Sequence, residues 1–152
     1  MSPIQPLKLA ALDEEDLKVL AAHVQDAVVK VADIKWSATT GAFLLPMNRF
    51  AWEMSAAAAR RANNQRRRAV LHFDKVKRVQ ASGVSAEDKD AVLSILTVVF
   101  EPGPEPPAGT ISIICAGDTT LRLEVEYIEA RLSDLGAAWT ASMRPEHRLG
   151  KV

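Results

Sequence analysis

Apolar and polar residues recur with two different periods along this chain, and each change of period marks the boundary of an expected element. Near the start, Leu17, Leu20 and Val24 follow an acidic stretch at the spacing of one helix face. Asp13 is placed to cap this helix, because its carboxylate can accept a hydrogen bond from an N–H of the first turn. We therefore expect a short strand at residues 7–11, followed by a helix.

The middle of the chain favours β-strands, because β-branched residues and a period of two replace the helical spacing. We expect strands at residues 27–36, 42–53 and 68–82, with Gly41 ending a turn between the first two. Pro46 indicates an edge position or a bulge in the second strand, since proline cannot donate to a β-ladder.

Two features refine the strands that follow. The strand at 68–82 changes phase between Phe73 and Val76, and a β-bulge at Asp74 and Lys75 would reconcile its two halves. Residues 91–101 are apolar on both faces, which predicts a central strand covered on both sides.

The last third of the chain predicts a hairpin and then a helix. Gly117 and Asp118 separate two alternating segments and suit a tight turn, with glycine supplying a positive φ. Residues 128–139 then return to helical spacing, which predicts an amphipathic helix docked on the sheet. The apolar stripe of this helix would consist of Ile128, Leu132, Leu135 and Trp139.

Together these elements predict a single α+β domain over residues 1–152, with loose tails at 1–6 and about 141–152. The sheet would be mainly antiparallel, with six or seven strands, or a partly open barrel, with an N-terminal helix and a C-terminal amphipathic helix. This is the layout of pleckstrin-homology-like barrels, and a likeness of layout transfers no function.

Charge and composition narrow the function classes. Lys+Arg and Asp+Glu both number 19, and the pI is about 6.8, whereas a dedicated nucleic-acid binder usually has a pI above roughly 9. Cys115 is the only cysteine, so no internal disulfide can form, and its phase predicts a buried structural role. No signal peptide or apolar membrane span is evident, and we therefore expect a cytoplasmic protein that does not bind membranes.

The segment RRANNQRRR at residues 60–68 concentrates positive charge. Arginine can hold phosphate or carboxylate in bidentate geometry, so this segment could form a docking surface for an anion. The alternative is a solvated loop that protects a sheet edge from aggregation, and the sequence favours the loop. The candidate surface consists of Arg60, Arg61, Arg66, Arg67 and Arg68.

The segment MNRFAWE at residues 47–53 is a second candidate surface. An exposed pair of Arg49 and Trp52 would be a typical interface hot spot, although core packing is the favoured interpretation of this segment.

Signatures of catalysis and of cofactor binding are missing. The chain has no phosphate-binding glycine motif and no CxxC or HExxH, and its three histidines are far apart in sequence. Glu124, Glu126 and Glu129 could line an acidic groove, but a solvated face explains them as well. We therefore expect no catalytic residue, no metal and no cofactor.

Several stretches resemble a known family over about residues 7–148. They are LKLAALDEEDLKVLAAHVQDAVVKVADIKW, MNRFAWE, GDTTLRLEVEYIEARLSDLGAAW and PEHR, and they are similar to the small bacterial proteins of domain of unknown function family 2948. The family has no assigned activity or site. The resemblance implies a bacterial, cytoplasmic, single-domain protein.

Three hypotheses of function remain open. The leading one is a non-enzymatic module that binds an unknown protein partner or a second copy of itself. The second is an anion or RNA binder that uses the arginine segment, although the neutral overall charge does not favour nucleic acid. The third is a small enzyme with an acidic groove.

Overall fold

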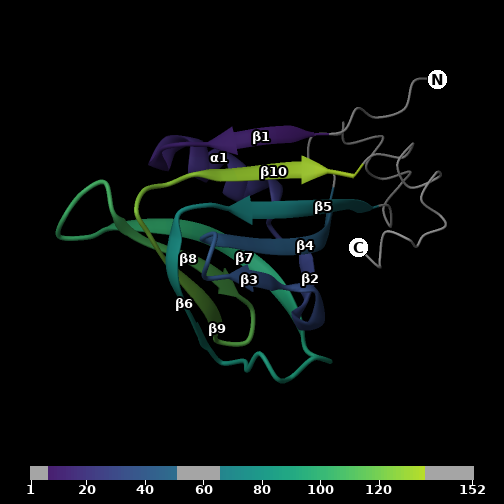
Figure 1. Cartoon of the computed structure of the whole chain (residues 1–152). Coiled ribbons are helices and arrows are strands. Elements are labelled where there is room, and N and C mark those ends of the chain that lie inside the picture. Colours follow the sequence, from purple (N-terminus) through teal and green to yellow (C-terminus); the bar gives the residue numbers. More distant parts are fainter. Residues whose placement is uncertain (1–6, 51–65, 136–152) are drawn as a thin grey trace, which may run out of the picture.

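Ten β-strands, paired antiparallel, and one short α-helix make up the fold of the described residues, 7–50 and 66–135, in the computed structural model (Figure 1). The strand order is β1-β10-β5-β4-β2-β7-β8-β9-β6, and β3 pairs with β4 beside this path. The elements are β1 (Lys8–Ala11), α1 (Glu14–His23), β2 (Val28–Lys30), the 3₁₀ turn η1 (Val31–Asp33), β3 (Lys35–Ser37), β4 (Ala42–Phe50), β5 (Arg66–Phe73), β6 (Val76–Ser82), β7 (Val92–Pro102), β8 (Gly109–Cys115), β9 (Thr119–Val125) and β10 (Ala130–Asp134).

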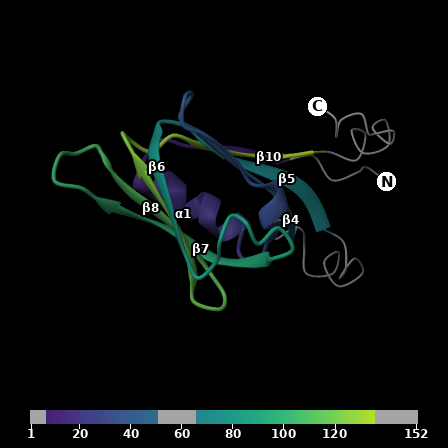
Figure 2. The same ribbon diagram turned by 60° about the horizontal axis from the view of Figure 1, so that its bottom comes forward.

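The strands form two halves that share β7. Its first residues pair with β2, and the rest of the strand pairs with β8. The chain passes between the halves at two corners, one from β5 to β6 and one from β9 to β10. Figure 2 shows the two halves facing each other with α1 between them, and α1 packs on β1 and β7. The core lies in this enclosed space.

The start of the chain follows the sequence prediction. The Asp13 carboxylate accepts a hydrogen bond of 2.8 Å from the backbone N–H of Asp16, which confirms the predicted cap. Leu17, Leu20 and Ala21 form the buried face of α1. The strand before the helix is also confirmed, as β1.

The predicted strand at 68–82 is two strands, and the bulge expected at Asp74 and Lys75 is a corner between them. Lys75 adopts a positive φ of 60°, which turns the chain from one half of the sheet into the other. The N–H of Asp74 donates to the carbonyl of Glu129, and the N–H of Glu126 donates to the carbonyl of Lys75. The two corners are therefore hydrogen-bonded to each other. The predicted strand at 27–36 is likewise divided, into β2, η1 and β3.

The predicted C-terminal helix is wrong over the described residues. Ala130, Leu132 and Asp134 are buried, whereas Arg131 and Ser133 between them are more exposed, which is the period of a strand. This strand, β10, pairs with β1 on one side and β5 on the other. The ten strands and the missing C-terminal helix also contradict the predicted fold class, so the pleckstrin-homology-like layout does not apply. Trp139 and the expected loose tails lie outside the described residues.

Two predictions about single strands also need correction. β7 is central, but it is not covered on both faces, because Val92, Leu96 and Val99 are 58%, 46% and 41% exposed. Pro46 lies inside the central strand β4, beyond the residues that pair with β3 and before Asn48, which pairs with β2. Pro46, which has no N–H, thus lies in the gap between the residues of β4 that pair with β3 and the residue that pairs with β2.

The hairpin between β8 and β9 is confirmed. Gly117 and Asp118 both adopt positive φ in its turn. Leu121, Leu123 and Val125 point into the core from β9, and Cys115 is buried at the end of β8. One face of this hairpin therefore belongs to the core, as its alternation predicts.

Candidate binding site

An apolar pocket of about 360 Å³ lies between β3 and β6. Among the described residues, β3 pairs only with β4 and β6 pairs only with β9, so each is an edge strand on the side that borders the pocket. The volume is at the lower end of the range for ligand pockets.

Apolar side chains from both halves of the sheet line this pocket. Trp36 of β3 stands over Phe43 of β4, with their rings tilted and their centroids 6.4 Å apart. Trp36 remains 37% exposed, so its ring is accessible at the mouth of the pocket, whereas Phe43 is buried beneath it. The complete lining is Val31, Ile34, Trp36, Phe43, Val79, Ala81, Val84, Ser85, Ala86, Lys89 and Leu121.

The backbone closes the pocket at both ends. At one end the N–H of Val76 donates to the carbonyl of Gly41 at 2.9 Å, which joins the start of β6 to the turn between β3 and β4. Gly41 has a φ of 76°, and a Cβ there would lie 3.3 Å from the carbonyl oxygen of Val76, so glycine suits both the turn and the close approach. At the other end the loop at 83–91 returns to η1, where the N–H of Val31 donates to the carbonyl of Ala91.

Few polar groups reach into the pocket. Among its described lining residues, the polar side-chain groups are the indole N–H of Trp36 and the side chains of Ser85 and Lys89, and the last two lie in the loop that follows β6. No carboxylate is part of this lining. The arrangement suits the burial of an apolar group more than proton transfer or nucleophilic attack.

A larger hollow of about 420 Å³ lies beside α1 and β7. Its lining includes Lys18, Gln25 and Thr97, and it is more open and more polar than the pocket between β3 and β6. We therefore regard the pocket between β3 and β6 as the candidate site.

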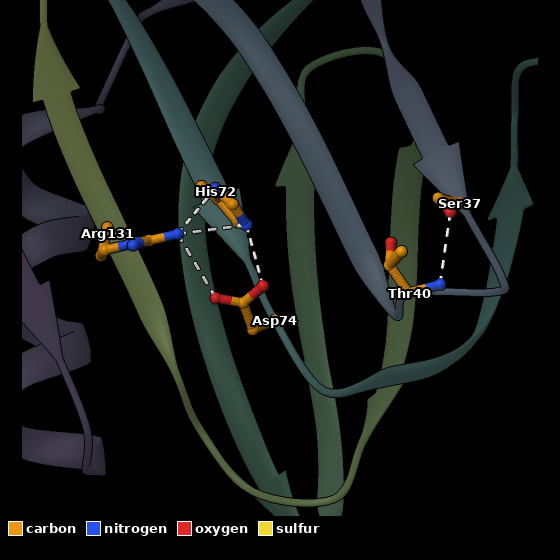
Figure 3. Close-up of polar contacts among 5 residues, drawn as sticks. All are labelled: Ser37, Thr40, His72, Asp74 and Arg131. Atoms are coloured by element: carbon orange, nitrogen blue, oxygen red, sulfur yellow. Dashed lines mark hydrogen bonds and ion pairs between the residues drawn. The ribbon is translucent and has the colours of Figure 1, made fainter.

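A polar cluster locks the corner between β5 and β6 (Figure 3). His72 Nε2 lies 2.9 Å from one carboxylate oxygen of Asp74, and Arg131 Nη2 lies 3.4 Å from the other. The same nitrogen of Arg131 is 3.0 and 3.3 Å from the two ring nitrogens of His72, so it contacts both the imidazole and the carboxylate. The polar groups of these three side chains bind one another, and we therefore assign them a structural role at this corner.

Arg49 lies in the interior and not on the surface. Its Nε and Nη2 each donate to one oxygen of Asp134 at 2.8 Å, and both side chains are fully buried. Nη1 donates to the carbonyl of Phe50 at 2.9 Å, and the backbone N–H of Leu7 donates to Asp134 at 2.9 Å. Burial of Arg49 agrees with the core packing that the sequence favours for this segment and removes Arg49 from the candidate surface, whereas Trp52 lies outside the described residues.

The structure separates the arginines of residues 60–68. Arg67 points inward from β5, opposite Arg49, and is 8% exposed. Arg68 points to the other face and is within 3.4 Å of Asp33. Arg60 and Arg61 lie outside the described residues, and of Arg66 only the backbone, in β5, is described. The described part of this segment is therefore a strand, not a loop.

The glutamates of the proposed acidic groove do not share a pocket. Glu124 lines a hollow of about 220 Å³ beside the loop at 103–108 and lies 3.7 Å from Arg78, whereas Glu126 and Glu129 are not part of the lining of this hollow. Cys115 is buried, as predicted, and burial raises the pKa of its thiol to about 11. A thiol with such a high pKa is a poor nucleophile at neutral pH.

The residues that line the pocket could not be identified as a site from the sequence. Trp36, Val79 and Leu121 occupy inward positions of their strands, and from sequence these positions are indistinguishable from core. An inward apolar residue on an edge strand would indicate such a pocket. Edge strands can be recognised only from the strand order, however, which the sequence does not show.

Two further findings concern the described residues. They contain no group of three or more His, Cys, Asp or Glu side chains placed to hold a metal ion. None of their helices has the length and apolar character needed to cross a membrane.

Comparisons with known proteins place the whole chain in one family. The model of the family described as protein of unknown function (DUF2948) matches residues 7–147. No curated protein and no solved structure matches the chain. The match covers nearly the whole sequence, and the chain therefore belongs to the DUF2948 family.

Proposed function

We propose that this protein is a non-enzymatic binding module that receives an apolar part of another molecule in the pocket between β3 and β6. The observation that carries the proposal is the pocket itself, a cavity of about 360 Å³ with a mainly apolar lining between two edge strands. An apolar surface that neighbouring strands leave uncovered gains free energy when a partner removes it from water.

The composition of the lining supports binding over catalysis. Ser85 and Lys89 lie together in one loop, and the described lining offers no carboxylate or histidine as a general base. The exposed face of Trp36 adds a large apolar contact, and tryptophan is enriched among residues that dominate binding energies.

The test uses the neutral dye Nile red, whose fluorescence increases in apolar surroundings, with the full chain and two variants. Ala81→Arg places a long charged side chain in the pocket. Gln80→Arg adds the same side chain at the neighbouring position of β6, which faces away from the pocket. We expect Ala81→Arg to weaken dye binding at least tenfold and Gln80→Arg to leave it unchanged.

Urea unfolding of both variants verifies that they are folded. Dye binding that is equally strong in Ala81→Arg and Gln80→Arg would contradict the proposal, as would a native chain that binds no dye.

A further inference from the structure

We propose that the occupant of the pocket is an extended peptide segment of another protein, which pairs through its backbone with the edge of β6. This inference rests on the proposed function, because it names the partner of the same site. It adds that recognition comes from backbone hydrogen bonds together with the apolar pocket.

The first argument concerns the polar groups beside the pocket. Binding sites for small molecules fix their ligands with a few converging polar groups. Here the side chains of the lining supply only the indole N–H of Trp36 with Ser85 and Lys89, whereas β6 presents a row of backbone N–H and C=O groups on its side away from β9. The partner that matches such a row is another strand.

The second argument is that β6 already forms one backbone hydrogen bond on this side, at its first residue. The N–H of Val76 points away from β9 and donates to the carbonyl of Gly41 at 2.9 Å. Beyond Val76, no described residue forms a strand pair with this side of β6. A peptide strand would continue a pairing that the fold begins at the Gly41 corner.

The third argument is that alternate residues of β6 line the pocket. Val79 and Ala81 of β6 both line the pocket, while Gln80 between them does not. A strand paired with β6 in register would place alternate side chains on the same face as Val79 and Ala81. A peptide with two small aliphatic residues separated by one position would therefore direct both of them into the pocket.

The charged residues at the two ends of β6 predict which end of the peptide is acidic and which is basic. Lys77 and Arg78 are exposed near the start of β6, whereas Glu87, Asp88 and Asp90 are exposed in the loop after it. Arg78 lies 3.7 Å from Glu124, but both side chains are well exposed and such a pair contributes little. We expect the peptide to have an acidic residue toward Val76 and a basic residue toward the loop.

The probes are capped hexapeptides with valine at the second and fourth positions, aspartate at one end and lysine at the other, made in both chain directions. Binding is followed by the fluorescence of Trp36 in the full chain carrying Trp52→Phe and Trp139→Phe, which leaves Trp36 as the only tryptophan. We expect one of the two directions to bind at least tenfold more tightly, and to slow hydrogen exchange at residues 79–82.

Methylation of the peptide amides provides the matched control. Alternate amides of a strand point in opposite directions, so the tighter peptide is made with either its odd or its even amides methylated. We expect one methylated series to bind at least tenfold more weakly and the other to bind like the parent.

Three results would overturn the inference, each in a distinguishable way. If both methylated series bind like the parent, side chains alone are recognised, and the strand pairing is refuted while the pocket keeps its function. If no peptide binds but Nile red does, the pocket takes small apolar molecules. If the protein alone dimerises and the dimer protects residues 79–82 from exchange, the occupant is a second copy of this chain.

Discussion

At the scale of single residues, burial changes the acid–base behaviour of Cys115. Burial raises the pKa of its thiol from 9.0 to about 11, since a thiolate loses its hydration in the core. The unfolded chain therefore releases this proton near pH 9, and the folded chain holds it until about pH 11. Between these values the unfolded state binds fewer protons, so the free energy of unfolding falls as the pH rises.

We expect this effect to remove about 2 kcal/mol of stability between pH 8 and pH 10.5. The measurement is urea unfolding at both pH values for the native chain and for Cys115→Ala. Lysines and the tyrosine titrate in both proteins, so the difference between the two losses isolates the thiol. Equal losses in the two proteins would show that the thiol is not buried in solution.

At the scale of elements, two turn glycines differ in what surrounds them. Gly83, directly after β6, has a φ of 85°, and a Cβ there would lie 2.4 Å from the carbonyl oxygen of Asp118. Gly117, in the β8–β9 turn, has a φ of 79° and no atom within 4 Å of such a Cβ. Alanine is strained by roughly 1 kcal/mol in this backbone region at either position.

We therefore expect Gly83→Ala to destabilise the protein by about 1–3 kcal/mol more than Gly117→Ala, because only the first also collides with backbone. Urea unfolding of the two variants gives the comparison directly. If the two losses are the same, the turn after β6 does not pack against the β8–β9 turn as described.

The elements that could be predicted from sequence are those whose determinants are local. Asp13 caps α1 within one turn of helix, and Gly117 with Asp118 forms the hairpin between neighbouring strands. In both cases the residues that decide the structure lie within a few positions of one another, so no long-range contact is needed to predict them.

The prediction of a C-terminal helix was wrong because a polar residue of this segment, Asp134, is buried. Ala130, Leu132 and Asp134 alternate inward along β10, but an aspartate reads as a surface residue unless its partner is known. That partner is Arg49, 85 positions earlier, and nothing in the sequence links the two residues. Because this ion pair cannot be identified from the sequence, neither the strand β10 nor the buried position of Asp134 could be predicted.

The candidate site could not be predicted from the sequence for a different reason. The apolar strand residues that line the pocket have the same alternating pattern as core residues, so the sequence does not distinguish the two groups. Only the strand order shows that β3 and β6 leave a gap between them. Turn signals identify neighbouring strands, but they do not specify long crossovers.

At the scale of the whole molecule, the pair of Arg49 and Asp134 connects segments from opposite parts of the chain. Asp134 in β10 binds the guanidinium of β4 and the N–H of Leu7, and its own N–H donates to the carbonyl of Leu7. The strands β1, β10, β5 and β4 are consecutive in the sheet, so this contact spans half of the fold. A buried charge that loses its partner is costly, because its desolvation is no longer offset.

We therefore expect Asp134→Asn to reduce the free energy of unfolding by about 3–5 kcal/mol, a large part of the stability of a domain of this size. The double variant Arg49→Met/Asp134→Leu should recover most of this loss, since it removes both charges and fills the space with apolar groups. Ser133→Ala, one position away on the outer face of β10, should change the stability by less than about 0.5 kcal/mol. Urea unfolding of the three variants measures each effect. An Asp134→Asn variant as stable as Ser133→Ala would mean that water reaches this pair in solution, and that the β1–β10–β5–β4 half is less tightly closed than its geometry indicates.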